Sequence, residues 1–191
     1  SGVWLSSAYP LPVEFDCLFA TAEATQFLVQ AATQFEELAC RMDAGSVKEI
    51  RYLTWSMACW CNLTRIGSKC AAQPTVEASR LFQLIQERQP GFPLSVHWAL
   101  LTRLPVDLKT LESLYQGRIA EGKYDNVEIL CQIYLHQGKE AEAAELMDRN
   151  KKSYNDAQAR WLWRHYRVQL AGALGEREVT ESIISEATDE E

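Results

Sequence analysis

The chain has 191 residues, of which 47% are hydrophobic and 24% charged, and its formal net charge is −7. It holds 9 Gly and 6 Pro against 22 Ala and 22 Leu, so Gly and Pro together fall below their ordinary share of roughly 12%. This composition excludes collagenous and disordered chains and disfavours a turn-rich sandwich or barrel. No apolar run approaches the roughly 20 residues of a membrane-spanning helix. We therefore expect a globular, all-α protein that does not enter a membrane.

The first twelve residues are predicted to form an extended N-terminal arm. Pro10 and Pro12 oppose a helix there, and an opening Ser-Gly without Met is typical of a cloning scar. Trp4 and Tyr9 lie in this arm, where no local core is evident. We predict that the arm packs on another subunit or on a distant helix of its own chain; a disordered tail is the alternative.

Helical spacing of apolar residues dominates the chain from residue 13 onwards. Four helices are expected before Pro105: over 13–43, from Ser46 to before Gly67, over 75–88 and over 94–104. Ser46 and Glu49 have the spacing of a capping box, in which each side chain satisfies a backbone N–H of the first turn. In the helix over 94–104 we expect Trp98 and Leu101 to face the core.

A helix, a turn of Gly plus a charged residue, and a second helix recur in the second half of the chain. Glu121-Gly122-Lys123 aligns with Gln137-Gly138-Lys139 at an offset of 16 residues, and Leu174-Gly175-Glu176 is a third copy. Repeated helical hairpins of this size are the unit of an α-solenoid. We predict about eight or nine helices in antiparallel hairpins over 13–187, followed by an acidic, frayed terminus at 188–191.

One hairpin carries a recognisable spacing, formed by Val127, Leu130, Cys131, Tyr134, Gly138, Ala143 and Met147. It resembles the tetratricopeptide-repeat (TPR) pattern over about one repeat. Val127 stands where that family favours Trp, Cys131 replaces its small residue, Met147 replaces its bulky aromatic residue, and the closing Pro is missing. The other hairpins do not keep the family's 34-residue period. The resemblance implies a concave groove for peptides or partner domains, or assembly through the edges of the array.

No spacing typical of catalysis or metal binding is present. His97, His136 and His165 are far apart, and the phosphate-binding and nucleophile motifs are missing. Cys59 and Cys61 would point about 200° apart on a helix and so could not share a metal ion. We predict no catalytic residue, no cofactor, no metal and no small-molecule substrate. The six cysteines are expected to be reduced, buried thiols of an intracellular protein, cytoplasmic or nuclear.

The segment from 148 to 167 is basic and aromatic, with six Lys or Arg against two Asp. Its candidate protein-interface residues are Trp161, Trp163 and Tyr166, together with Trp4 and Tyr9 of the arm. Its candidate nucleic-acid contacts are Lys151, Lys152, Arg160, Arg164 and Arg167, since arginine beside stacking rings is one way to hold single-stranded RNA. In the alternative interpretation Trp161 and Leu162/Tyr166 pack inward, while Arg164 and Arg167 meet nearby acidic helices.

These observations favour a non-enzymatic domain for protein interaction or oligomerisation, cut from a larger intracellular protein. Its partner would be another protein or a second copy of the chain. Two alternatives remain: an RNA-binding helical domain that uses the cluster at 160–167, and a TPR-like secretion chaperone.

Overall fold

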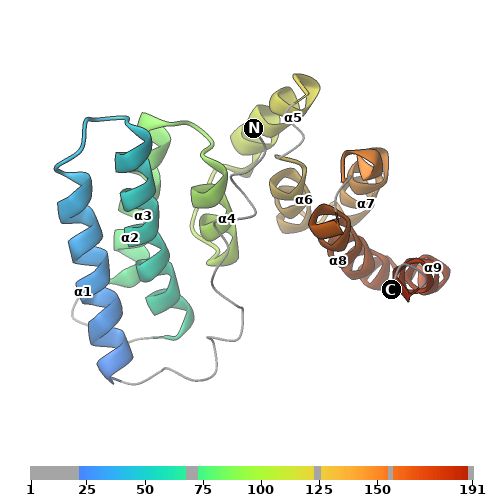
Figure 1. Cartoon of the computed structure of the whole chain (residues 1–191), viewed down its shortest axis with the longest axis horizontal. Helices are drawn as coiled ribbons and strands as arrows, with labels where there is room; N and C mark the ends of the chain where they lie inside the picture. The colour runs from blue at the N-terminus through green and yellow to red at the C-terminus, as the bar shows by residue number, and fades with distance from the viewer. Residues whose placement is uncertain (1–21, 68–72, 123–125, 155–156, 189–191) are drawn as a thin grey trace. The chain divides into compact units, whose positions relative to one another are not determined.

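The computed structural model describes residues 22–67, 73–122, 126–154 and 157–188 (Figure 1). These residues form nine α-helices and one short 3-10 helix, and no strand occurs among them. The predicted all-α class is therefore confirmed. The arm with Trp4 and Tyr9 lies outside the described residues, as does the acidic terminus apart from residue 188.

The helices divide into two compact units with a boundary after Asp107. The N-terminal unit holds α1 (Ala22–Ala39), α2 (Val47–Arg65), α3 (Pro74–Arg88) and α4 (Pro93–Leu101). The C-terminal unit holds α5 (Leu108–Ala120), α6 (Val127–His136), α7 (Glu140–Arg149), the 3-10 helix η3 (Lys151–Ser153), α8 (Ala157–Leu174) and α9 (Arg177–Thr188).

Helix α2 is the centre of the N-terminal unit, because it packs against α1, α3 and α4. Its side chains are buried on more than one face, and α3 and α4 complete the core with Leu81, Ile85, Val96 and Leu100. Helix α2 begins at the predicted capping box, where Ser46 Oγ accepts from the N–H of Glu49 at 3.2 Å. The Glu49 carboxylate reaches back to the N–H of Gly45, one residue before the expected partner.

Helix α4 faces the core with the opposite side from the one expected. Its buried residues are Ser95, Val96, Ala99 and Leu100, whereas Leu101 is 43% exposed and Trp98 is half-buried. The prediction that Trp98 and Leu101 face the core is therefore wrong for Leu101, and Trp98 is only half-buried. Helix α4 is apolar on nearly all sides, so apolar spacing alone could not select the buried face.

In the C-terminal unit each α-helix packs on the one before it in sequence, from α5 to α9. The core residues come from every helix: Leu111, Tyr115, Leu130, Ile133, Met147, Trp163, Leu170 and Ile183. The hairpin of α6 and α7 turns at Gly138, whose φ is +69°. There the N–H of Lys139 donates to the carbonyl of Tyr134 at 2.9 Å, the bond that defines a Schellman C-cap.

Arg103 occupies, after α4, the position that Gly138 occupies after α6, although it lacks the conformational freedom of glycine. Arg103 follows the end of α4 with a φ of +53° and is the one non-glycine at positive φ among the described residues. Two bonds close this turn: Leu104 N–H donates to Ala99 O at 2.9 Å and Arg103 N–H donates to Leu100 O at 3.0 Å. They correspond to the bonds from Lys139 N–H to Tyr134 O and from Gly138 N–H to Leu135 O after α6. A side chain in this left-handed region is strained by contact with its own backbone.

The described thiols follow the prediction in part; Cys17 and Cys70 lie outside the described residues. Cys61 and Cys131 are buried, and burial raises the pKa of each to about 12. Cys59 is half-buried, and burial raises its pKa to about 11. Cys40 is exposed, so the prediction of a buried thiol is wrong there. None of the helices in the described part of the chain has the length and apolar character needed to cross a membrane.

A polar network ties α5 to the turn between α6 and α7. The Glu112 carboxylate accepts from Lys139 Nζ at 3.0 Å and from Gln137 Nε2 at 2.9 Å. The hydrogen bond from Lys139, followed by that from Gln137, lowers the pKa of Glu112. Lys139 Nζ also lies 5.5 Å from the ring centroid of Tyr134.

The Glu112 network predicts an acid-sensitive term in the stability. Because the folded-state pKa lies below the ordinary 4.5, the stabilisation is complete above that pH and is lost as the pH falls through the lowered value. The pair is near the surface, so we expect less than about 1 kcal/mol. Urea denaturation from neutral to acidic pH should show this loss in the wild type and a flatter profile in Glu112→Gln; identical profiles would contradict it.

The left-handed backbone of Arg103 predicts that Arg103→Gly stabilises the protein. Removing the strained Cβ should raise the free energy of unfolding by about 1 kcal/mol, and the melting temperature by a few degrees. The matched control is Gly138→Ala, which introduces a Cβ at the equivalent position after α6 and should destabilise by a similar amount. A lower melting temperature in Arg103→Gly would show that Arg103 is not strained.

Candidate functional site on helix α8

The described part of the aromatic–basic segment comprises the end of α7, η3 and the first part of α8. Its predicted site residues differ widely in burial. Trp163 and Arg167 are each 5% exposed, whereas Trp161 is 62% exposed. Residues 161 and 163 lie about 200° apart around a helix, so the two tryptophans face opposite sides of α8. The exposed group comprises Trp161, Lys151 and Lys152, while Arg160, Arg164 and Tyr166 are half-buried.

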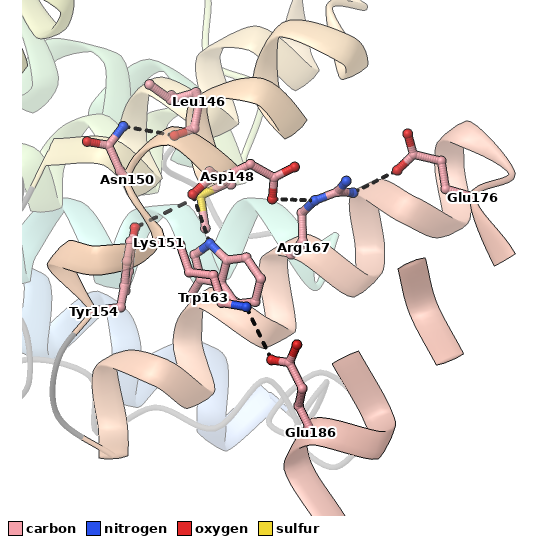
Figure 2. A network of polar contacts seen from close by, with 10 residues as sticks. Leu146, Asp148, Asn150, Lys151, Tyr154, Trp163, Arg167, Glu176 and Glu186 are labelled. Atoms are coloured by element: carbon pink, nitrogen blue, oxygen red, sulfur yellow. Dashed lines mark hydrogen bonds and ion pairs between the residues drawn. The ribbon is translucent and has the colours of Figure 1, made fainter. Parts of the chain in front are cut away.

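Arg167 is the ionic centre of the buried group. Its Nε lies 2.9 Å from Asp148 Oδ1 at the end of α7, and its Nη1 lies 2.9 Å from Glu176 Oε2 before α9 (Figure 2). Two carboxylates thus satisfy one guanidinium, which suits the fork-like geometry of arginine. These hydrogen bonds favour the charged form and raise the pKa of Arg167 against the lowering effect of burial. We name this arrangement the Arg167 bridge; it connects α7, α8 and α9.

Trp163 is also held by contacts inside the C-terminal unit. Its Nε1 donates to the carbonyl of Met147 at 2.8 Å, and Lys151 Nζ lies 4.6 Å from its ring centroid. Lys151 also pairs with Glu186 of α9 at 3.2 Å, and Figure 2 shows this pair beside the Trp163 ring. Lys151 therefore connects η3 to α8 by a cation–π contact and to α9 by an ion pair.

The tyrosine hydroxyls near α8 are also engaged internally. Gln132 Nε2 of α6 donates to the Tyr166 hydroxyl at 2.6 Å, and burial raises the pKa of Tyr166 to about 12. The Tyr154 hydroxyl donates to Met147 Sδ at 3.9 Å, and burial raises its pKa further still. Both hydroxyls therefore stay protonated near neutral pH.

The outer side of α8 carries a different structure, which we name the α8 ridge: Trp161, His165 and Gln169. All three are exposed. The rings of Trp161 and His165 stack with centroids 5.3 Å apart and planes 12° apart, and Gln169 Nε2 lies 3.1 Å from His165 Nε2. The ridge thus presents a flat, pre-ordered aromatic surface with hydrogen-bonding groups at its end.

These positions reduce the set of predicted site residues. The alternative interpretation is wrong for Trp161, whose side chain is 62% exposed rather than packed inward. Trp163 and Arg167 were expected to contact a partner, but both are held inside the unit, so we remove them from the candidate site. Lys151 is engaged by Trp163 and Glu186. Lys152 and Trp161 are exposed, and with the half-buried Arg160, Arg164 and Tyr166 they remain predictions.

Sequence reasoning missed His165 as a site residue. Its spacing of four residues from Trp161 places both rings on one helix face, which is a signal that could have identified the pair. Gln132 and Glu186 were also missed, and their contacts with the segment join residues 34 and 35 positions apart. No local pattern in the sequence predicts such pairs.

Comparison with known proteins identifies no relative: no family model, no curated protein and no solved structure matches the chain. Within the described ranges, no group of three or more His, Cys, Asp or Glu is placed to hold a metal ion. The interpretation of the site therefore depends on its own geometry.

The Arg167 bridge predicts that Arg167→Met destabilises the protein. Methionine keeps part of the buried stem but removes both ion pairs, and we expect a loss of about 1–3 kcal/mol. The loss is moderated because Asp148 and Glu176 are 51% and 38% exposed and therefore screened. Urea denaturation followed by circular dichroism measures it, with Asp148→Asn as a control that should lose less. A variant as stable as the wild type would contradict a structural role for the bridge.

Proposed function

We propose that the protein is a non-enzymatic binding scaffold whose partner surface is the α8 ridge. One observation carries this proposal: Trp161 is 62% exposed yet held in a defined orientation by its stack on His165. A large aromatic side chain on the surface of an ordered helix is unfavourable in water and is typical of a binding hot spot. Its stack also reduces the entropy lost when a partner covers it.

The arrangement of α5–α9 supports a solenoid-like scaffold. These helices pack on their neighbours in sequence, which is the pattern of an array in which each unit contacts the next. We infer a TPR-like array, in line with the buried residues Val127, Leu130 and Met147 of the α6–α7 hairpin. In such arrays, binding surfaces are formed by rows of outward side chains, and the partner is a protein segment or a second copy of the chain.

To test the α8 ridge we choose Trp161→Ala, with Phe27→Ala as the matched control. Phe27 is 69% exposed but lies on α1 in the other unit. Light scattering over a range of concentrations measures self-association, and chemical crosslinking in cells with mass spectrometry identifies other protein partners. We expect Trp161→Ala to lose the association or the partners, and Phe27→Ala to retain them. If the wild type stays monomeric and neither variant changes its crosslinked partners, the proposal is contradicted.

RNA binding is the second candidate, and the flat stack of Trp161 on His165 favours it, because nucleobases stack on such platforms. Arg164, three residues after Trp161 on α8, would supply a cation near this platform, and the exposed Lys152 of η3 is the second predicted contact. Fluorescence anisotropy with a labelled single-stranded RNA, between about 50 and 200 mM salt, distinguishes the candidates. Tight, salt-sensitive binding that Lys152→Glu with Arg164→Glu weakens would favour RNA over a protein partner.

A further inference from the structure

A second feature, in the N-terminal unit, is the outer face of α4. Since Ser95, Val96, Ala99 and Leu100 are the residues that α4 buries, helical geometry places Leu94, Trp98 and Leu101 on the opposite face. Leu94 and Trp98 are half-buried, and Leu101 is 43% exposed. Spaced four and three residues apart, they form an apolar row along the helix, which we name the α4 face.

Arg103 stands directly beyond the end of this row. Every other left-handed position among the described residues is a glycine: Gly45, Gly67, Gly91, Gly122, Gly138 and Gly175. At φ +53° Arg103 has a backbone conformation that disfavours any side chain with a Cβ. A turn that Gly would form with less strain thus carries the longest cationic side chain. Strain of this kind points to a role for the side chain rather than for the turn.

The Arg103 guanidinium is available for that role. The residue is exposed, and it forms no ion pair or side-chain hydrogen bond with any residue that the structure describes. By contrast, Arg80, Arg149 and Arg177 of the same chain each pair with a carboxylate. An exposed cation next to an apolar row complements a partner with an apolar stripe and a carboxylate at its end.

We propose that the α4 face and Arg103 together form a docking site for an acidic amphipathic helix of a partner protein. The partner's apolar stripe packs along Leu94, Trp98 and Leu101, as ridges of one helix fill grooves of another. A Glu or Asp beyond the stripe pairs with the Arg103 guanidinium, which can donate two parallel hydrogen bonds to a carboxylate. This site lies in a different unit from the α8 ridge and does not depend on it.

The experiment uses two synthetic helical peptides of about three turns with identical leucine stripes, one flanked by Glu and the other by Lys. Anisotropy of the labelled peptides measures their binding to the full chain. We expect the acidic peptide to bind at least about ten-fold more tightly, because the like-charged peptide meets Arg103. The chain's net charge of −7 acts in the opposite direction, so non-specific attraction would favour the basic peptide.

Three variants separate the contributions of the Arg103 charge, the strained turn and the apolar row to peptide binding. Arg103→Lys keeps both the charge and the strained turn and should retain most of the preference for the acidic peptide. Arg103→Gly relieves the strain, so it should melt at a higher temperature while losing the preference, which separates loss of the site from unfolding. Leu101→Asp should weaken the binding of both peptides, and its circular dichroism spectrum checks that it folds.

Several outcomes would overturn the proposal. Equal binding of the two peptides, no binding of either, or an unchanged preference in Arg103→Gly would each do so. Light scattering that shows a concentration-dependent mass, lowered in Arg103→Gly, would assign the site to a second copy of the chain. Binding of a labelled single-stranded RNA that Arg103→Gly removes would assign Arg103 to phosphate contacts.

Discussion

The fold depends on one recurring backbone constraint: α2, α4, α5, α6 and α8 each turn toward the next helix at a residue with left-handed geometry close behind their last turn. In the described residues seven positions have positive φ, six of them glycines and the seventh Arg103. At Gly138 and Arg103 the chain forms the same pair of bonds to the last turn of the helix, so glycine and arginine perform one structural task. Of the eight glycines that the structure describes, six have this geometry, and Gly117 and Gly172 lie inside α5 and α8. The exception at Arg103 is informative, because a residue less suited to the turn occupies it.

A single helix, α8, divides the aromatic–basic segment between structure and surface. Its inner side is held by the Arg167 bridge and by the hydrogen bond from Trp163 to the Met147 carbonyl. Its outer side carries the stacked pair of Trp161 and His165. Part of the positive charge of this segment is thus neutralised by carboxylates inside the C-terminal unit. These internal ion pairs weaken the case for RNA relative to a protein partner, since fewer cations remain for phosphate groups.

Local features were predictable, because their causes lie within a few residues. The all-α class and the capping box at Ser46 follow from spacing and from the chemistry of the first helical turn. The division after Asp107 was not predictable, since helical periodicity is similar on both sides of it. The buried face of α4 was also not predictable, because that helix is apolar on nearly all sides. For Arg167, the deciding carboxylates are 19 and 9 residues away in the chain, beyond the range of any local pattern.

Helix α8 places two tryptophans that are two residues apart on opposite sides, so that Trp163 is buried and supports the fold while Trp161 is exposed. Urea denaturation of Trp161→Ala and Trp163→Ala, followed by circular dichroism, tests this most directly. Loss of the buried Trp163 ring should cost about 3–5 kcal/mol, whereas loss of the exposed Trp161 ring should change the stability by no more than about 0.5 kcal/mol. Equal destabilisation by the two substitutions, or a neutral Trp163→Ala, would contradict the account.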